Sequence, residues 1–166
     1  MKFYRTHLTG SMLALVATLA IQPATTNAAG LVASDGATSD YFGFSASLSG
    51  TVGLVGAYGD DIGFNFDRGS AYVFRNLDTA TGTITQNVKL IASDGAASAY
   101  FGSSASLSGT VGLVGAYGDS VGGSYNRGAA YLFRNLDTAT GTITENVKLT
   151  LSDGMAEDSF RPLREP

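Results

Sequence analysis

Short stretches of alternating apolar and polar residues run through the chain, separated by segments rich in Gly, Asp and Asn. This pattern is typical of β-strands joined by turns. Residues 42–48 have an apolar side chain at every second position, which predicts one apolar strand face made of Phe42, Phe44, Ala46 and Leu48. The next stretch, Thr51–Ala57, is apolar on both faces apart from its glycines, as a central strand would be.

Two further strands are predicted before the pattern starts again. Ala71–Arg75 has Tyr72 and Phe74 on one face. Thr83–Ile91 alternates apolar with polar residues, which predicts an outer strand with one face in water. The polar segment Asn76–Gly82 between them is typical of a hairpin loop. The predicted unit is therefore four short strands in succession.

The unit is repeated in tandem with a period of 59 residues. Leu31–Lys89 and Leu90–Lys148 align without a gap and are identical at 46 of 59 positions. A third copy begins at Leu149 and follows the pattern to Phe160, after which Arg161 stands where the first two copies have Gly. The predicted divisions are a first repeat at 29–89, a second at 90–148, and a truncated third with a divergent tail at 149–166.

Residues 1–28 have the composition of a secretory signal peptide. Lys2 and Arg5 give a positive start, Met12–Ile21 is a mostly apolar run, and a polar stretch ending in small residues follows. A transmembrane anchor, the alternative, would need about 20 apolar residues. We expect cleavage after Ala28 or Ala29. The mature protein would then be secreted or held at the cell surface, with the bacterial periplasm as a further location.

Three short sequence words occur in the same order and spacing in both repeats. The first two are Phe-Gly, at residues 42 and 101, and Val-Gly-Ala, at residues 55 and 114. The third is Arg-Gly-Ser-Ala-Tyr-Val-Phe at residue 68, which becomes Arg-Gly-Ala-Ala-Tyr-Leu-Phe at residue 127. In these words the chain resembles FG-GAP repeat proteins of the bacterial secreted type. Such repeats also form the blades of the integrin α-subunit propeller. The resemblance implies an all-β fold of four-stranded antiparallel blades, but little about the ligand, because one fold hosts many functions.

Two complete blades and part of a third are too few to close a propeller, which takes about 4–8 blades. We therefore predict an incomplete propeller. Three explanations are open. The chain is a truncated relative of a longer protein, or several copies assemble into one ring as a homo-oligomer, or the two blades pack face to face as a small sandwich.

Composition narrows the chemistry that is open to the mature chain. There is no Cys, and the only His, His7, lies in the predicted signal peptide. Cleavage therefore excludes Ser-His-Asp and Cys-His nucleophilic sites and His-ligated zinc. Loss of Lys2 and Arg5 leaves eight basic against fourteen acidic residues, a net charge of −6, which disfavours nucleic acid as a partner. We predict a protein that is not an enzyme, with Ca²⁺ as the one cofactor considered.

The loop between the second and third strands is the best candidate for a ligand site, because loops carry function more often than the strands they join. In the first repeat it has four side chains with the oxygen ligands that Ca²⁺ prefers: Asp60, Asp61, Asn65 and Asp67. Some FG-GAP blades bind Ca²⁺ through a D-x-D-x-D-G loop, and this loop departs from that pattern. In the second repeat only Asp119 is retained, and Ser120, Ser124 and Asn126 replace the others. This variation favours a solvated loop with turn-forming residues.

The same loop carries the aromatic residues that we predict for recognition, Phe64, Phe66 and Tyr125. Other repeated residues receive structural interpretations. We expect the four repeated arginines to pair with repeated aspartates rather than to bind an anionic ligand: Arg68, Arg75, Arg127 and Arg134 with Asp35/Asp94, Asp60/Asp119 or Asp78/Asp137. We expect four aromatic residues to fill the space between blades: Tyr41, Phe42, Tyr72 and Phe74.

These observations favour a non-enzymatic exported repeat protein that acts as a binding or structural module at the cell surface or outside the cell. Its ligand would be a protein or a carbohydrate. One alternative is a calcium-dependent adhesion or carbohydrate-binding module. A second is a fragment of a larger propeller protein with no independent function. An enzyme would have to work with carboxylates, Tyr and Arg alone.

Overall fold

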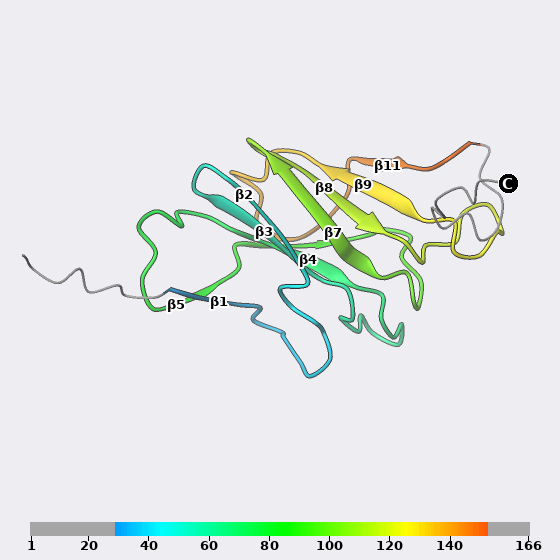
Figure 1. Cartoon of the computed structure of the whole chain (residues 1–166), viewed down its shortest axis with the longest axis horizontal. Helices are drawn as coiled ribbons and strands as arrows, with labels where there is room; N and C mark the ends of the chain where they lie inside the picture. The colour runs from blue at the N-terminus through cyan, green and yellow to red at the C-terminus, as the bar shows by residue number, and fades with distance from the viewer. Residues whose placement is uncertain (1–28, 153–166) are drawn as a thin grey trace, which may run out of the picture.

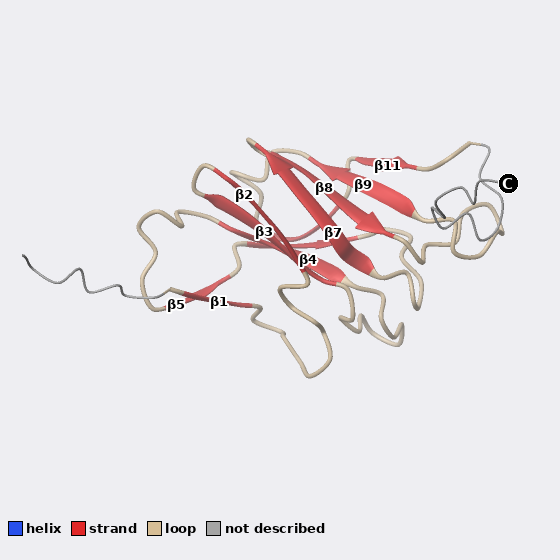
Figure 2. Cartoon of the chain, viewed as in Figure 1, coloured by secondary structure: helices blue, strands red, loops and turns tan. Residues whose placement is uncertain are grey.

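The computed structural model describes residues 29–152; the predicted signal peptide and residues 153–166 of the third repeat lie outside this part. Within it every regular element is a strand, as Figure 2 shows, which confirms the predicted all-β class. The strands are β1 Gly30–Val32, β2 Ser45–Ser49, β3 Val52–Ala57, β4 Ser70–Phe74, β5 Thr83–Thr85, β6 Val88–Ile91, β7 Phe101–Ser108, β8 Val111–Ala116, β9 Ala129–Phe133, β10 Gly141–Thr144 and β11 Val147–Leu149.

Each repeat builds one antiparallel sheet, which we call a blade. The first blade contains β2, β3, β4 and β6 in sequence order, and the second contains β7, β8, β9 and β11 (Figure 1). Adjacent strands within each of these sets pair antiparallel. The four-stranded blade predicted from the sequence is therefore confirmed in both repeats.

The single strand predicted at Thr83–Ile91 is wrong, because this stretch forms two strands in different sheets. β6 completes the first blade, whereas β5 pairs parallel with β1. In the second repeat β10 pairs parallel with β6 and so extends the first blade to five strands. Asn87 lies at the break, where its Oδ1 accepts a hydrogen bond from Arg75 N–H (2.7 Å) and its own N–H donates to Val73 O (2.8 Å).

The two blades pack face to face, and the main core lies between them. Strand β7 packs against β2 and β3, and Figure 1 shows it running alongside them. Both repeats contribute buried side chains to this core: Leu54, Ala71, Val73, Val88, Leu90 and Ala92 from the first, and Phe101, Leu107, Val114, Ala116, Tyr131, Phe133 and Leu136 from the second. Face-to-face packing, one of the arrangements considered for a pair of blades, is thus present within the described residues.

Glycine allows the backbones of the two blades to touch. A Cβ atom on Gly56 would lie 2.0 Å from Gly102 O, a distance at which no side chain fits. The same carbonyl accepts a hydrogen bond from the Ser45 hydroxyl (2.8 Å), and Ser47 Oγ accepts one from Leu107 N–H (3.0 Å). Gly56 therefore permits a close backbone contact between the blades at this position.

The predicted apolar face at residues 42–48 is correct only in part. Gly43 has a φ of 91° and β2 begins at Ser45, so the alternation is interrupted and Phe44 leaves the face. Leu48 is 66% exposed, although its counterpart Leu107 is 8% exposed. The reason is that Leu107 faces the first blade, whereas on the side of Leu48 the described residues supply only the small β1–β5 sheet.

Candidate functional site

Each blade contains the same partly buried cluster of two carboxylates, one lysine and one tyrosine. In the first blade Lys89 Nζ lies 2.5 Å from Asp35 Oδ2 and 2.6 Å from Asp60 Oδ2. The Tyr72 hydroxyl donates to Asp35 Oδ1 (3.1 Å), and the Ser70 hydroxyl donates to Asp60. The second blade repeats the cluster with Lys148, Asp94, Asp119 and Tyr131. The cluster ties the turn before each blade to the blade's third and fourth strands.

Burial and ion pairing act in opposite directions on the cluster. Burial raises the pKa of the Asp35 carboxyl, but the hydrogen bond and the positive charge of Lys89 outweigh it, so the pKa is below the ordinary 3.8. Burial lowers the pKa of Lys89, but its bonds to Asp35 and Asp60 bring that pKa above 10.5. Burial beside two carboxylates raises the pKa of the Tyr72 hydroxyl. Asp35, Lys89 and Tyr72 therefore exchange no protons near neutral pH.

The prediction that repeated arginines pair with repeated aspartates is wrong. The four ion pairs within residues 29–152 all use lysine. The guanidinium groups instead donate to backbone carbonyls: Arg75 Nε to Leu136 O (2.8 Å) on the other blade, and Arg68 Nη2 to Ala92 O (2.7 Å). The lysines and the arginines both recur at the 59-residue period of the repeat. The sequence pattern therefore did not indicate which of the two residue types pairs with the carboxylates.

In the loop predicted to bind calcium, two of the four residues have side-chain partners in the chain. Asp60 belongs to the ion-pair cluster, and Asp61 Oδ1 accepts a hydrogen bond from Asp67 N–H (2.8 Å). Asn65 pairs through its backbone with Ile62. Among the described residues no three His, Cys, Asp or Glu side chains gather as metal ligands do. Calcium binding at this loop stays a prediction, which a thermal melt with and without Ca²⁺ tests.

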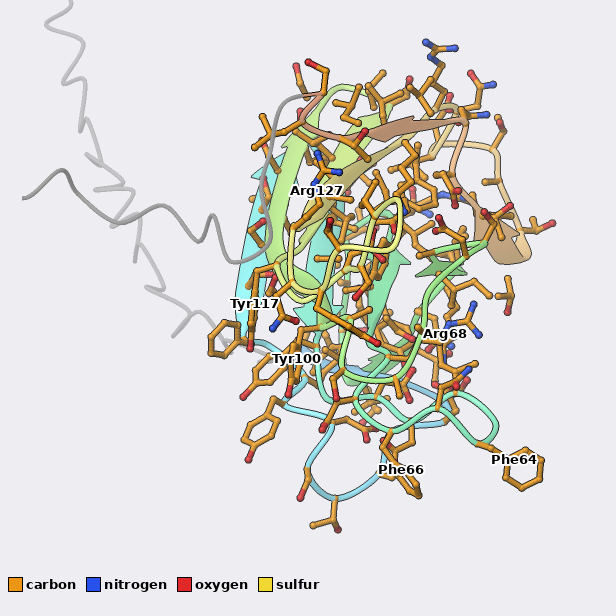
Figure 3. All side chains as sticks on the ribbon, turned by 90° about the vertical axis from the view of Figure 1, so that its right-hand side faces the viewer. Phe64, Phe66, Arg68, Tyr100, Tyr117 and Arg127 are labelled. Atoms are coloured by element: carbon orange, nitrogen blue, oxygen red, sulfur yellow. The ribbon has the colours of Figure 1, made fainter. Side chains whose placement is uncertain are left out.

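The three aromatic residues predicted for recognition are exposed, with Phe64 at 99%, Phe66 at 68% and Tyr125 at 77%. Figure 3 shows Phe64 and Phe66 pointing away from the ribbon. They stand singly, since none of the ring pairs within residues 29–152 includes one of them. Their role in recognition stays a prediction.

A row of packed aromatic rings crosses both blades, and sequence analysis missed it. Tyr41 and Tyr58 stack with centroids 4.9 Å apart, and Tyr100 and Tyr117 stack at 4.8 Å. Tyr58 and Tyr100 join the two pairs at 5.9 Å, and Phe44 packs edge-on against Tyr58 at 4.5 Å. We call these five residues the aromatic ladder. Figure 3 shows the rings of Tyr100 and Tyr117 side by side and projecting from the ribbon.

The prediction that Tyr41 fills the space between blades is therefore wrong, because its side chain lies in the ladder and is 56% exposed. Tyr72 and Phe74 are fully buried, but on the side of the first blade that faces away from the second. Their counterparts Tyr131 and Phe133 do lie in the core between the blades.

Tyr41 and Tyr100 hold their rings at a cost in backbone energy. Their φ angles are 54° and 55°, in the left-handed region, which is unfavourable for a bulky side chain. Residues held there cost about 1–3 kcal/mol each. Gly59 leaves room for the first ring, since a Cβ atom there would lie 2.9 Å from Tyr41 Cδ2. An exposed side chain such as Tyr41 gains little from core packing in return, so the strain points to another use.

The family model of the FG-GAP repeat matches residues 25–74 and 84–133. The chain belongs to the FG-GAP repeat family. The two FG-GAP matches are offset by the 59 residues of the tandem repeat, and each ends where the third strand of its blade ends. No curated protein matches the chain in sequence.

Membership of the FG-GAP family indicates a β-propeller-type module for binding or structure. In the described part of the chain there is no helix with the length and hydrophobicity to cross a membrane. The two FG-GAP matches together contain all five ladder residues. A signal for the ladder was present, because Tyr41 and Tyr58 flank the Phe-Gly and Val-Gly-Ala words and recur as Tyr100 and Tyr117. Their stacking across two repeats needed the structure.

Proposed function

We propose that this FG-GAP protein is an exported, non-enzymatic binding module whose aromatic ladder binds the apolar face of carbohydrate rings. The observation that carries the proposal is the row of five packed rings, of which Tyr41, Phe44 and Tyr117 are 56%, 60% and 60% exposed. Monomeric proteins seldom expose clustered aromatic surface unless it binds something.

The chemistry of the ladder suits a sugar. A pyranose ring has one face of C–H groups that packs against a flat aromatic ring, and hydroxyl groups around its rim that need polar partners. Tyrosine offers both, because an apolar ring carries a hydroxyl that donates and accepts hydrogen bonds. Four of the five ladder residues are tyrosines.

The repetition of the ladder favours a polymer over a single sugar. The stacked pair Tyr41–Tyr58 recurs one repeat later as Tyr100–Tyr117, and Tyr58 lies beside Tyr100. Equivalent sites in a row bind repeated units of one chain with an effective concentration that raises the overall affinity. We therefore expect a polysaccharide to bind more tightly than its monosaccharide.

Export and the absence of catalysis rest on the sequence. Residues 1–28 have the pattern of a signal peptide, and the chain after it contains no His or Cys. FG-GAP repeats are typical of extracellular and surface domains. Lys89 and Asp35 keep their charges near neutral pH, so neither has a pKa in the range in which a general acid or base works best.

Affinity electrophoresis of the mature chain through gels that contain soluble polysaccharides tests the proposal. We expect retardation by at least one neutral polysaccharide and a loss of about tenfold in affinity when one ladder ring is removed, corresponding to about 1.4 kcal/mol. Tyr41→Asn and Tyr100→Asn are the informative variants, because Asn tolerates a positive φ and should not lower the melting temperature.

Phe64→Ser is the matched control, because Phe64 is an exposed aromatic residue outside the ladder. It should bind as the unmodified chain does. Two results would overturn carbohydrate binding by the ladder. One is no retardation by any polysaccharide in a panel of neutral and acidic polymers, and the other is unchanged retardation of both Tyr→Asn variants.

A further inference from the structure

We propose that copies of this chain associate head to tail, with the second blade of one copy packing on the first blade of the next as the two blades pack within the chain. Both surfaces needed for this contact are at least partly open in residues 29–152, and the one on the first blade is covered in part by the β1–β5 sheet. Because the repeats are nearly identical, each open surface carries the residues of one side of the internal contact.

The first blade presents the residues that the second blade uses in the internal contact. Leu107 and Leu136 of the second blade lie in the core between the blades. Their counterparts one repeat earlier, Leu48 and Leu77, line an open groove on the far side of the first blade. We call this surface the head face and define it by Phe42, Ala46, Leu48, Val55 and Leu77.

The second blade presents the other half of the contact. In the first blade Leu54 and Leu90 are fully buried against the second blade. Their counterparts Leu113 and Leu149 are 38% and 46% exposed. We call this surface the tail face and define it by Leu113, Ala130, Leu132 and Leu149.

A specific side chain of the head face fits the tail face. Within the chain Phe101 packs on its own blade, with its ring 5.3 Å from that of Tyr131, and at the same time covers the first blade beside Gly69. Phe42 has the same relation to its own blade, 5.7 Å from the ring of Tyr72. In the assembly the Phe42 ring would enter the apolar groove of a second copy, which is lined by Gly128, Ala129, Ala130, Leu149 and Leu151.

The polar contacts have matching counterparts as well. Within the chain Ser47 Oγ and Ser49 Oγ accept hydrogen bonds from Leu107 N–H and Gly109 N–H, both at 3.0 Å. The equivalent serines of the second blade, Ser106 and Ser108, are exposed. The equivalent donors, Leu48 N–H and Gly50 N–H, belong to the head side of the first blade. Arg134 is the counterpart of Arg75, whose side chain donates a hydrogen bond to Leu136 O on the other blade.

One strand has to change places for the contact to form completely. The pairing of β1 with β5 has the same register as the pairing of β6 with β10. Leu31 lies beside Ile84 in the first, and Leu90 lies beside Ile143 in the second. β1 therefore occupies the place that β11 of a neighbouring copy takes in the assembly. In the assembly β11 of the neighbouring copy, which ends at Leu149, would pair with β5 in place of β1. The receiving copy would keep its own position from Ala33 onward. The exchange replaces one three-residue strand with another of the same length.

Head-to-tail contacts close into a ring when the rotation between copies allows it. Residues 29–152 of each copy bring two blades, and propellers close with about 4–8 blades. The expected assembly is therefore a ring of about two to four copies. The relation that places Tyr58 beside Tyr100 within the chain would place Tyr117 of one copy beside Tyr41 of the next, so the ladder would continue from copy to copy. The association is nevertheless tested without carbohydrate, by the mass of the protein alone.

Sedimentation equilibrium of the mature chain tests the association with two variants, Leu48→Lys in the head face and Leu113→Glu in the tail face. We expect the unmodified chain to have the mass of a small oligomer and each variant alone to be a monomer. An equimolar mixture of the variants should give a dimer, because the intact tail of Leu48→Lys meets the intact head of Leu113→Glu. Both substituted side chains are partly exposed in the single copy, and circular dichroism checks that both variants fold.

Three outcomes would overturn the proposal. The first is an unmodified chain that stays monomeric at millimolar concentration. The second is Leu113→Glu remaining associated while Leu48→Lys does not, which indicates a symmetric head-to-head contact. The third is a mixture that contains only monomers.

The strand exchange has a test of its own. Val32→Pro removes a backbone donor from β1 and weakens its pairing with β5, so it should strengthen association severalfold. Phe64→Lys, in an exposed loop outside both faces, is the control and should leave the mass unchanged. Weaker association of Val32→Pro would contradict the exchange of β1 for β11.

Discussion

Lys89 Nζ lies 2.6 Å from Asp60 Oδ2, and the two side chains are 14% and 6% exposed. The pair joins β6 to the loop that follows β3, and so links the last strand of the first blade to its centre. Lys148 and Asp119 form the same pair at 2.6 Å in the second blade. Each blade is therefore closed by one partly buried lysine between two carboxylates, and loss of this lysine should affect stability strongly.

Replacing this lysine should destabilise the protein strongly. Lys89→Met keeps the length and apolar part of the side chain but leaves the Asp60 carboxylate buried without its cation. Breaking a buried pair from one side costs about 3–5 kcal/mol. We expect a loss of that size in the free energy of unfolding, measured by urea denaturation.

The double variant Lys89→Met, Asp60→Asn separates loss of charge balance from loss of packing. It should recover part of the stability lost in Lys89→Met, because no uncompensated charge remains buried. Lys148→Met in the second blade is the matched comparison, with a lysine that is 22% exposed. A loss below about 1 kcal/mol in Lys89→Met would place the pair among ordinary surface salt bridges and contradict this account.

The pH dependence of stability follows from the same clusters. The pKa values of Asp35 and Asp94 are lowered in the folded protein, so their contribution is present above pH 3.8 and is lost as the pH falls through the lowered folded values. The pKa values of Lys89 and Lys148 are raised, so their contribution is present below pH 10.5 and is lost above it. We expect a flat melting temperature between about pH 5 and 9, falling on both sides.

Melting curves followed by circular dichroism across the pH range check this expectation. The fall on the alkaline side should become shallower in Lys89→Met, because one titrating lysine has been removed. A melting temperature that changes steeply near neutral pH would show that another group, with a pKa in that range, controls stability.

The order of strands within a blade is predictable because alternation and turn residues are local signals. The departure of β5 from its blade is not, because its partner β1 is distant in sequence and the apolar alternation continues through Asn87. Identical residues also differ between the repeats. Leu48 is 66% exposed and Leu107 is 8% exposed, since burial depends on what lies opposite and not on the local sequence.

The same distinction applies to the candidate site. The exposure of Phe64 and Phe66 could be predicted because they lie in a polar loop between strands. The ladder could not, because the contact of Tyr58 with Tyr100 depends on how the two blades pack. Sequence spacing placed Tyr41 beside Phe42 in one predicted core, but a positive φ at Tyr41 turns its ring outward.

Alanine at Gly56 should weaken the contact between the blades. Its Cβ atom would lie 2.0 Å from Gly102 O and 2.9 Å from Gly102 C, which are backbone atoms that cannot move aside without separating the blades. Overpacking of this kind costs about 1–3 kcal/mol. We expect Gly56→Ala to lose stability at the upper end of this range, measured as a shift of the urea midpoint.

Gly115→Ala is the matched control, because it makes the same change at the same position of the second repeat. A Cβ atom there would meet only the side chain of Ser104, at 2.3 Å from Oγ, and a hydroxyl can rotate away. In a single copy the cost should be clearly smaller than for Gly56→Ala. Equal losses in the two variants would show that the glycine is required by the strand itself and not by the contact between blades.

The two blades should unfold as one cooperative unit. β10 of the second repeat completes the sheet of the first, and the main core takes its side chains from both repeats. We expect a single transition in dilute solution, with the same midpoint by far-ultraviolet dichroism and by the near-ultraviolet signal of the tyrosines. Leu107→Ala should lower both midpoints together and cost about 2–5 kcal/mol, because Leu107 is buried in the shared core.

Leu48→Ala makes the equivalent change where the side chain is exposed, so its cost in a single copy should be below about 0.5 kcal/mol. Two resolved transitions in the unmodified chain would contradict a shared core. A Leu107→Ala variant whose two midpoints separate would show instead that the blades are coupled only weakly. In that case β10 would hold the blades together through its strand pairing with β6 alone.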